Sequence, residues 1–350
     1  MNDVYDIAII GLGPAGSTLA RCLNKNYKVI AFDKKSDNDM KCCGGLLSPD
    51  AQKILAKFDL YLPSNVLVDP QIFSVRTIDF SNNLEKYYQR FYLNMDRGKF
   101  DRWLISLIPS HVEIKKETFC SKITKIDNLY EIEYRNKEKI QKIKAKVVVG
   151  SDGAFSLVRR TFYNNIKIKE YVSIQEWYKK DYKEGIYTSI FDKELTNSYC
   201  WTISKDDYFI LGGAFKKDNA VEKFELFKKK LQDYGYTFGN FVKKEGCFVY
   251  LSDDLTKVET GKNNAYLIGE AAGFISPSSL EGISYAMESG YLLAEILNKN
   301  LLSKSSVYKR KTFKLKTKLF LKILKRPFMY NKVLRYFVMK SGISSIKKLK

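Results

Sequence analysis

One glycine-rich turn near the N-terminus constrains the fold more than any other feature of this chain. Residues 4–10 form an apolar, β-branched run of strand length, and the sequence Gly-Leu-Gly-Pro-Ala-Gly follows directly at residues 11–16. Residues 17–24 then have a helical pattern. A strand, a glycine turn and a helix in this order are typical of a βαβ unit, whose helix N-terminus offers N–H groups to phosphates. The sequence therefore predicts a Rossmann-type dinucleotide site.

Each part of this turn has a predicted role. Gly11 permits the tight turn, Gly13 lets the backbone approach a pyrophosphate, and Gly16 allows close packing of helix on strand. A second strand, residues 27–32, ends at Asp33, about 20 residues after the glycines, where an acid binds a ribose hydroxyl. The residues expected to contact the dinucleotide here are Gly11, Gly13, Pro14, Ala15, Gly16, Asp33 and Lys34.

A second glycine-rich stretch lies far along the chain. Residues 264–273 are predicted as a buried strand that ends in glycines, and residues 283–297 as a helix. Together with the first stretch, this pattern indicates one dinucleotide bound from both ends of the chain. The additional expected contacts are Gly269, Glu270, Gly273, Pro277, Gly282 and Ile283.

The segments between these stretches are mostly β structure, with alternating patterns at residues 85–93, 198–204 and 208–215. We therefore predict an α/β fold, in which a Rossmann-like cofactor-binding domain carries an inserted antiparallel β-sheet domain for the substrate and a C-terminal helical segment. The predicted boundaries are 1–65, 94–165 and 256–300 for the cofactor-binding domain, 66–93 and 166–255 for the substrate domain, and 301–350 for a basic helical region.

Composition excludes several classes of chemistry. The chain has one histidine, His111, which argues against a Ser-His-Asp mechanism, and six cysteines without metal-ligand spacing, so no metal site is expected. The cysteines are typical of reduced thiols in a cytosolic protein. The first strand begins at residue 4 and no run of about 18 uncharged apolar residues occurs, so the prediction is a cytoplasmic chain without a spanning helix.

The charge is concentrated at the C-terminus. Residues 301–350 contain sixteen Lys and Arg and no Asp or Glu, so they carry +16 of the net +21. A basic amphipathic helix suits an anionic membrane surface, which would place the chain peripherally on the inner face of the membrane. A helical cap on the core with a solvated basic face explains the pattern equally well. An acidic electron carrier also suits a basic surface. Nucleic acid is disfavoured because no groove-reading motif accompanies the charge.

Over about residues 3–300 the chain resembles the FAD-dependent oxidoreductases of the p-hydroxybenzoate hydroxylase fold, and among them the geranylgeranyl reductase group. Besides the two glycine stretches, Met95-Asp96-Arg97 and Gly150-Ser151-Asp152-Gly153 match motifs of this family. The resemblance implies FAD as the cofactor and Arg97 as a contact to it. Glu270, which replaces the usual aspartate, is expected to bind a ribityl hydroxyl. Asp152 either contacts the cofactor or caps the turn after its strand.

Two further segments resemble the reductase group in particular. Residues 41–48 resemble its cysteine–glycine loop, which implies that Cys43, Gly44 and Gly45 form the catalytic loop. Cys43 is expected either to position or protonate the substrate, or simply to fill a tight loop. Residues 199–205 resemble an aromatic motif of the group, with Ser204 in place of a proline. Strand alternation places three side chains on one face, where they line an apolar tunnel or belong to the sheet core: Tyr199, Trp201 and Ile203.

The resemblance implies that the protein reduces C=C bonds of a geranylgeranyl-type or related lipid, using hydride from reduced flavin. A monooxygenase or halogenase acting on an aromatic or natural-product substrate is the first alternative, and a non-catalytic flavin-bearing membrane adaptor is the second. No second GxGxxG follows a strand. The electron donor therefore stays open between NAD(P)H and ferredoxin.

Overall fold

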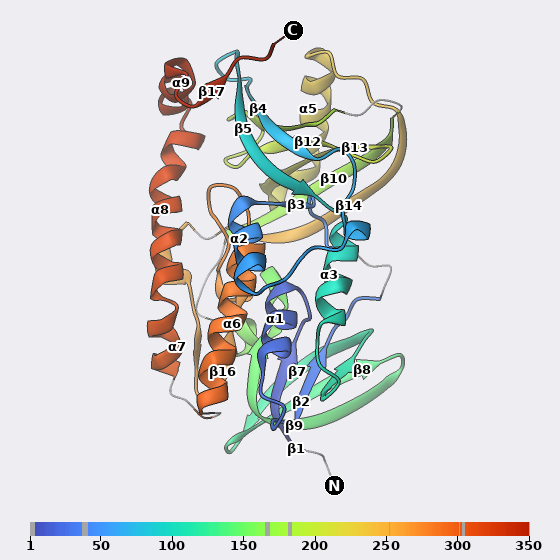
Figure 1. The fold of residues 1–350 in the computed structure, drawn as a ribbon, viewed down its shortest axis with the longest axis vertical. Coiled ribbons are helices and arrows are strands. Elements are labelled where there is room, and N and C mark those ends of the chain that lie inside the picture. The colour runs from blue at the N-terminus through green and yellow to red at the C-terminus, as the bar shows by residue number, and fades with distance from the viewer. Residues whose placement is uncertain are drawn as a thin grey trace. The chain divides into compact units, whose positions relative to one another are not determined.

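The computed structural model describes residues 4–36, 41–164, 169–180, 184–251, 253–300, 302 and 305–349. The chain divides into two compact units, each assembled from three separate stretches (Figure 1). Unit 1 comprises residues 1–40, 100–169 and 250–321, and unit 2 comprises residues 41–99, 170–249 and 322–350.

Within the first 300 residues, this division differs from the predicted domains mainly at residues 41–65 and 94–99. We predicted both stretches in the cofactor-binding domain, but they lie in unit 2. One physical reason is strand pairing, because β3 (Leu46–Leu47) pairs with β5 (Leu84–Asn94), with Leu46 opposite Asn94.

Unit 1 contains a mixed sheet in the order β15-β16-β9-β1-β2-β6, and the antiparallel hairpin β7–β8 extends it from β9. Its central strand β1 pairs in parallel with β2 and β9, so that Ile9 lies opposite Ala31 and Val149. All of β2 is buried, as expected for a parallel strand covered on both faces. The strands are β1 Val4–Ile10, β2 Val29–Phe32, β6 Val112–Lys115, β7 Thr118–Ile126, β8 Leu129–Asn136, β9 Lys139–Gly150, β15 Gly261–Lys262 and β16 Ala265–Leu267.

The helices of unit 1 connect these strands. α1 and α6 approach each other closely, since a side chain at Gly290 would overlap the carbonyl of Ala15. The strand predicted over 264–273 is shorter than expected, because a 3-10 turn begins at Gly269. The helices are α1 Pro14–Cys22, α4 Leu157–Phe162, α6 Ile283–Lys299 and α7 Ser305–Lys311, with 3-10 turns η2 Gly153–Phe155, η4 Leu255–Lys257 and η5 Gly269–Ala272. Helix α3 (Arg97–Ser106) begins in unit 2 and ends in unit 1.

Unit 2 is built on a sheet in the order β14-β10-β13-β12-β11-β4-β5-β17, with β3 paired to β5. We predicted an antiparallel sheet, and the observed sheet is mixed, because β4 and β11 come from separate stretches of chain and pair in parallel. The remaining strands are β4 Ile72–Asp79, β10 Lys169–Lys179, β11 Ile186–Phe191, β12 Cys200–Lys205, β13 Tyr208–Lys216, β14 Asn240–Leu251 and β17 Ser345–Ile346. Helix α5 (Ala220–Asp233) covers one face, where Phe224, Phe227 and Leu231 join the core.

The basic C-terminal residues are not a separate region. Leu315 and Leu319 join a core cluster of unit 1, whereas β17 pairs with β5 in unit 2. The C-terminal helices are α7, α8 Phe313–Tyr330 and α9 Lys332–Ser341. The remaining elements of unit 2 are α2 Pro49–Lys57 and the 3-10 turns η1 Ser64–Val66 and η3 Lys217–Asn219. Among the described residues, no helix combines the length and hydropathy needed to cross a membrane.

Candidate functional site

The turn between β1 and α1 has the backbone geometry that its glycines predict. Gly11 has a φ of +98°, in the left-handed region that favours glycine. A side chain at Gly16 would overlap the Gly11 carbonyl and lie 2.7 Å from the hydroxyl of Ser151. That hydroxyl donates to the Gly11 carbonyl at 2.6 Å. The end of β9 therefore closes the turn.

The start of α1 fits a pyrophosphate. Gly13 is the N-cap residue, and α1 has neither a side-chain cap nor an acidic residue in its first turn. A Cβ atom added to Gly13 would meet no described atom within 4 Å, so there is open space beside it. Pro14 has no N–H, so the donors available at this end belong to Ala15 and Gly16. These groups and the positive end of the helix dipole suit phosphate oxygens.

Asp33 lies directly after β2, as predicted. Its carboxylate is buried and accepts the N–H of Lys35 at 3.2 Å. Burial raises the pKa of Asp33, and the hydrogen bond from Lys35 opposes that rise. The carboxylate is an acceptor suited to a ribose hydroxyl. Lys34 is exposed beside it.

The second glycine stretch forms a tight turn after β16. Gly269 and Gly273 have positive φ values of +57° and +90°. The Glu270 carboxylate is buried, and its Oε1 accepts the N–H of Tyr250 at 3.1 Å. Its Oε2 lies 3.7 Å from where a Cβ of Gly153 would stand. One oxygen of Glu270 thus holds the backbone of Tyr250, which also belongs to unit 1, and the predicted contact of Glu270 to a ribityl hydroxyl stays a prediction.

Arg159 is a structural residue of this turn that the sequence reasoning missed. Its guanidinium donates to the Ala271 carbonyl at 2.9 Å and lies 4.8 Å from the ring centre of Tyr250. Burial lowers the pKa of Arg159, and the nearby Tyr250, Asp152 and Glu270 oppose this lowering. The available signal was an arginine in the short helix α4, close after the predicted Gly-Asp motif.

The Asp152 side chain connects the end of β9 to the first residue of α4. Its Oδ2 accepts the N–H of Leu157 at 2.6 Å, and Oδ1 is buried without a hydrogen-bond partner among the described residues. Burial raises the pKa of this carboxyl group. This hydrogen bond fits the capping role that we held as an alternative, and a contact of Asp152 to the cofactor stays a prediction.

The remaining predicted cofactor contacts fall in both units. Pro277 is buried in unit 1, and Gly282 is the N-cap residue of α6, which begins at Ile283. Arg97 is buried at the start of α3 in unit 2. Within unit 1, the structure places the turn at 11–16 and Asp33 at the carboxyl ends of the neighbouring strands β1 and β2.

The predicted catalytic loop lies in unit 2, against β12. A Cβ added to Gly44 would lie 2.8 Å from Cδ1 of Ile203 and 3.8 Å from Nε1 of Trp201. Gly45 has a φ of +63°, and its N–H donates to the sulfur of Cys43 at 3.4 Å. The structure thus brings together Cys43–Gly45 and the predicted strand face.

That strand face is largely buried. Trp201 and Ile203 are 7% and 1% exposed, and the Tyr199 ring lies 5.7 Å from the Trp201 ring. The indole also covers Gly212, where a Cβ would lie 2.8 Å from Nε1. This Nε1–H is buried without a hydrogen-bond partner among the described residues, which is costly unless a ligand or water accepts it.

Lys205 organises this loop and was missed by the sequence reasoning. Its buried Nζ donates to Oδ1 of Asn94 at 2.5 Å and to the carbonyls of Met95 and Gly45 at 2.8 and 3.2 Å. Burial lowers the pKa of Lys205 to about 7, against the opposing charges of Cys43, Asp96 and Asp206. The available signal was alternation, because Lys205 follows Trp201 and Ile203 on the same face of β12.

Cys42 differs from its neighbour Cys43. Cys42 is buried, whereas Cys43 is partly exposed. A hydrogen bond with the Cys247 thiol, together with burial, raises the pKa of Cys42 well above its ordinary value. Cys42 is therefore a protonated, enclosed thiol, which favours Cys43 as the reactive one.

Solved structures that match this fold include flavin-dependent proteins. A geranylgeranyl bacteriochlorophyll reductase-like protein from Thermoplasma acidophilum matches with a TM-score of 0.72 at 19% identity, covering 99% of this chain and 89% of that one. CmlS, a flavin-dependent halogenase, matches at 0.71 with 17% identity, covering 91% and 63%. PqsL, a probable FAD-dependent monooxygenase from Pseudomonas aeruginosa, matches at 0.70 with 14% identity, covering 97% and 100%. The chain has the fold of FAD-dependent oxidoreductases.

Curated relatives identify the family to which this chain belongs. Protein CbrA from Escherichia coli strain K12 is 45% identical over 350 residues, covering 99% of both chains, and Protein CbrA from Shigella sonnei matches equally. The chain belongs to the CbrA family. No protein-family model matches it.

Proposed function

We propose that this protein is a FAD-dependent oxidoreductase that reduces carbon–carbon double bonds of a prenyl lipid of geranylgeranyl type. The observation that carries the proposal is the loop Cys43–Gly45 held against Trp201 and Ile203. The likeness to a reductase-like protein over 99% of this chain supports it.

The residues of unit 1 fit the cofactor. Gly13 leaves space for a pyrophosphate, the first turn of α1 supplies uncapped donors, and Asp33 offers an acceptor to a ribose. FAD supplies the hydride-transfer chemistry when bound. Arg97, Asp152, Glu270, Pro277, Gly282 and Ile283 complete the proposed set of contacts.

In this proposal, unit 2 supplies the substrate side. The buried Trp201 and Ile203 make the surroundings of the loop apolar, and reduction of an isolated alkene requires surroundings that exclude water. Cys43 positions the substrate or holds the proton that the second carbon receives. Lys205 keeps the loop in place through the Gly45 carbonyl. The electron donor is NAD(P)H or ferredoxin.

An anaerobic assay tests the proposal. The bound flavin is reduced chemically, oxygen is excluded, a geranylgeranyl lipid is added, and flavin absorbance is followed together with the mass of the lipid. The expected result is flavin reoxidation with hydrogen added to the lipid. A flavin that stays reduced with every prenyl lipid until air is admitted would refute the reductase function.

Oxygen chemistry is the second candidate, because the halogenase and monooxygenase structures match almost as well as the reductase-like one. This candidate predicts NAD(P)H-dependent oxygen uptake that an aromatic or natural-product substrate stimulates. The halogenase-type W-x-W-x-I-P motif is absent from residues 199–205, which disfavours halogenation. A flavin-bearing membrane adaptor would retain flavin and show neither activity.

A further inference from the structure

Helix α8 exposes an apolar stripe to solvent. Phe320, Leu324 and Phe328 follow one another at four-residue spacing and are 46%, 52% and 51% exposed. Phe313 and Leu321 extend the stripe with exposed fractions of 70% and 60%. Because four residues make about one helical turn, these side chains share one face.

The opposite face of α8 already supplies its packing in unit 1. Leu315 and Leu319 are fully buried in a core cluster there. Lys318 pairs with Glu288 at 2.8 Å, and Lys316 donates to the Val258 carbonyl at 3.4 Å. The exposed stripe is therefore not required for holding the helix on its core.

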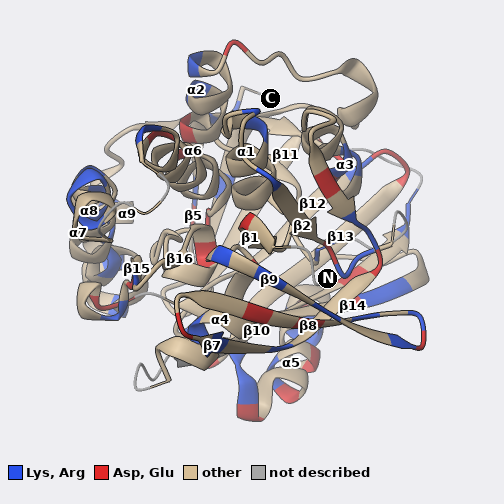
Figure 2. Cartoon of the chain, turned by 90° about the horizontal axis from the view of Figure 1, so that it is seen from below, with Lys and Arg blue, Asp and Glu red and all other residues tan. Residues whose placement is uncertain are grey.

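Basic side chains flank the stripe. Helix α8 contains six Lys and Arg and no acidic residue, and Figure 2 shows Lys and Arg gathered on α7 and α8. An apolar stripe flanked by lysines is typical of helices that lie in the interface of an anionic bilayer, because aromatic and leucine side chains enter the headgroup boundary while lysines bind the headgroups.

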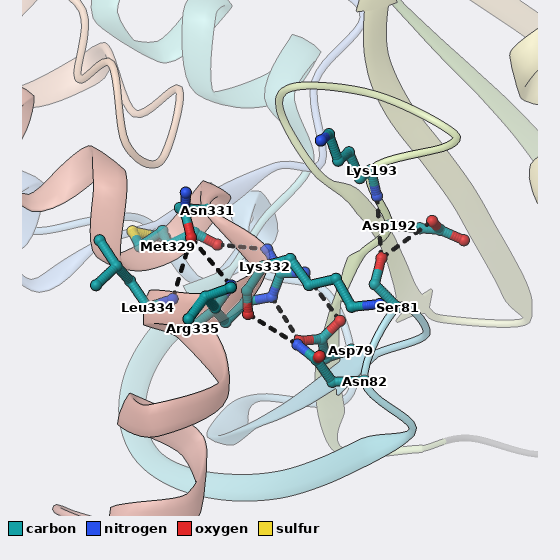
Figure 3. A network of polar contacts seen from close by, with 11 residues as sticks. Asp79, Ser81, Asn82, Asp192, Lys193, Met329, Asn331, Lys332, Leu334 and Arg335 are labelled. Atoms are coloured by element: carbon teal, nitrogen blue, oxygen red, sulfur yellow. Dashed lines mark hydrogen bonds and ion pairs between the residues drawn. The ribbon is translucent and has the colours of Figure 1, made fainter.

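The C-terminal end of α8 is anchored within unit 2. Figure 3 shows Arg335 of α9 directed at Asp79 of β4. The Nε–Oδ2 and Nη2–Oδ1 distances of this ion pair are 2.7 and 2.8 Å. Nη1 of Arg335 also donates to the Met329 carbonyl at the end of α8, at 2.8 Å. Opposite Arg335, α9 exposes Val333 and Phe337. Both helices thus expose apolar side chains opposite their anchored faces.

We propose that the exposed stripe of α8, with its flanking lysines, docks this protein on an anionic lipid bilayer surface. This proposal rests on exposed side chains and charge, and it depends on neither the proposed reductase function nor the cofactor. We infer an anionic lipid surface as the binding partner because the last fifty residues carry a charge of +16.

Vesicle sedimentation with the full-length protein tests the proposal. The expected result is binding to phosphatidylglycerol vesicles at low salt, weaker binding at high salt, and little binding to phosphatidylcholine alone. Phe320→Ser with Leu324→Ser should abolish binding. Lys311→Gln with Lys314→Gln should weaken it by roughly fivefold for each lysine. Phe119→Ser with Ile140→Ser, which removes comparably exposed apolar side chains from unit 1, is the matched control and should bind normally.

Three outcomes would overturn the proposal. The first is that the wild-type protein does not bind phosphatidylglycerol vesicles at low salt. The second is that the Phe320/Leu324 variant binds as well as the wild type. The third is that the control variant loses as much vesicle binding as the Phe320/Leu324 variant. Retention on immobilised polyglutamate without vesicle binding would instead assign the basic surface to an acidic protein. Thermal melting of each variant checks folding, because exposed substitutions change stability by only about 0.5 kcal/mol.

Discussion

At the scale of single residues, one buried amine holds the loop that carries Cys43. Lys205 uses three hydrogen bonds to join Gly45, Asn94 and Met95, so it fixes both the loop and the junction of β5 with α3. Gly45 in turn donates its N–H to the Cys43 sulfur. Lys205 therefore helps to position the candidate catalytic thiol through Gly45.

The depressed pKa of Lys205 predicts a pH-dependent stability. Between its folded pKa of about 7 and the ordinary value of 10.5, the unfolded chain binds more protons at this site, so the free energy of unfolding rises with pH in that window. Lys205→Met should remove this rise, a difference of about 2 kcal/mol between pH 7 and pH 9 by urea unfolding. The exposed Lys193→Met should keep it. Parallel pH profiles for wild type and Lys205→Met would contradict the assignment.

The two adjacent cysteines should react differently. With iodoacetamide on the native protein near pH 7.5, Cys43 should be alkylated at least about tenfold faster than Cys42, because Cys42 is buried and its raised pKa keeps it protonated. Mass spectrometry of the peptide that spans residues 41–48 in Cys42→Ser and Cys43→Ser variants gives the two rates. Comparable rates would mean that Cys42 is not enclosed as described.

Substitutions at two glycines of the first turn should distinguish an effect on cofactor binding from an effect on folding. Gly13→Ala places its methyl group in open space, so flavin retention should fall while the melting temperature of the apoprotein is unchanged. Gly16→Ala should destabilise the apoprotein itself by about 1–3 kcal/mol, because its methyl group meets the Gly11 carbonyl. Full flavin retention by a folded Gly13→Ala protein would place the pyrophosphate elsewhere.

At the scale of elements, α9 is held to β4 by a buried ion pair. Arg335 and Asp79 are 4% and 0% exposed, and Asn82 adds a hydrogen bond to the Lys332 carbonyl at 2.9 Å. Both guanidinium–carboxylate bonds are short, so neither charge depends on water for its partner. This pair fixes where the exposed face of α9 points.

Breaking that pair on one side should be costly. Arg335→Met leaves Asp79 buried and unpaired, which should lower the free energy of unfolding by about 3–5 kcal/mol. The double variant Arg335→Met with Asp79→Asn should recover part of the loss. Urea unfolding measures both, and a single-variant loss below about 1 kcal/mol would show that the pair contributes little.

At the scale of the whole molecule, the basic C-terminal residues are part of both units. Removing residues 301–350 deletes the fully buried Tyr308, Leu315 and Leu319 as well as Arg335. Each buried leucine alone contributes about 2–5 kcal/mol, so the truncated chain should be largely unfolded. Circular dichroism checks this. A truncated protein that melts like the full chain would show that the tail is a dispensable appendage.

The sequence predicted unit 1 better than unit 2. The βαβ turn and Asp33 were recognisable because local spacing determines their geometry. Strand pairing between distant segments leaves no such local signal, so the parallel pairing of β4 with β11 and the position of residues 41–65 in unit 2 were missed. Lys205 and Arg159 were also overlooked, because local patterns place them on their elements but do not identify their partners, which are mostly distant backbone carbonyls.

The interleaving of three chain stretches in each unit also constrains biosynthesis. Strand β9 of unit 1 obtains its partner β16 only when residues 265–267 have emerged. From residue 150, where β9 ends, to residue 267, the ribosome needs roughly 6–23 s at about 5–20 residues per second. During this time the apolar edge of β9 lacks its neighbour, which makes the nascent chain a natural client for chaperones.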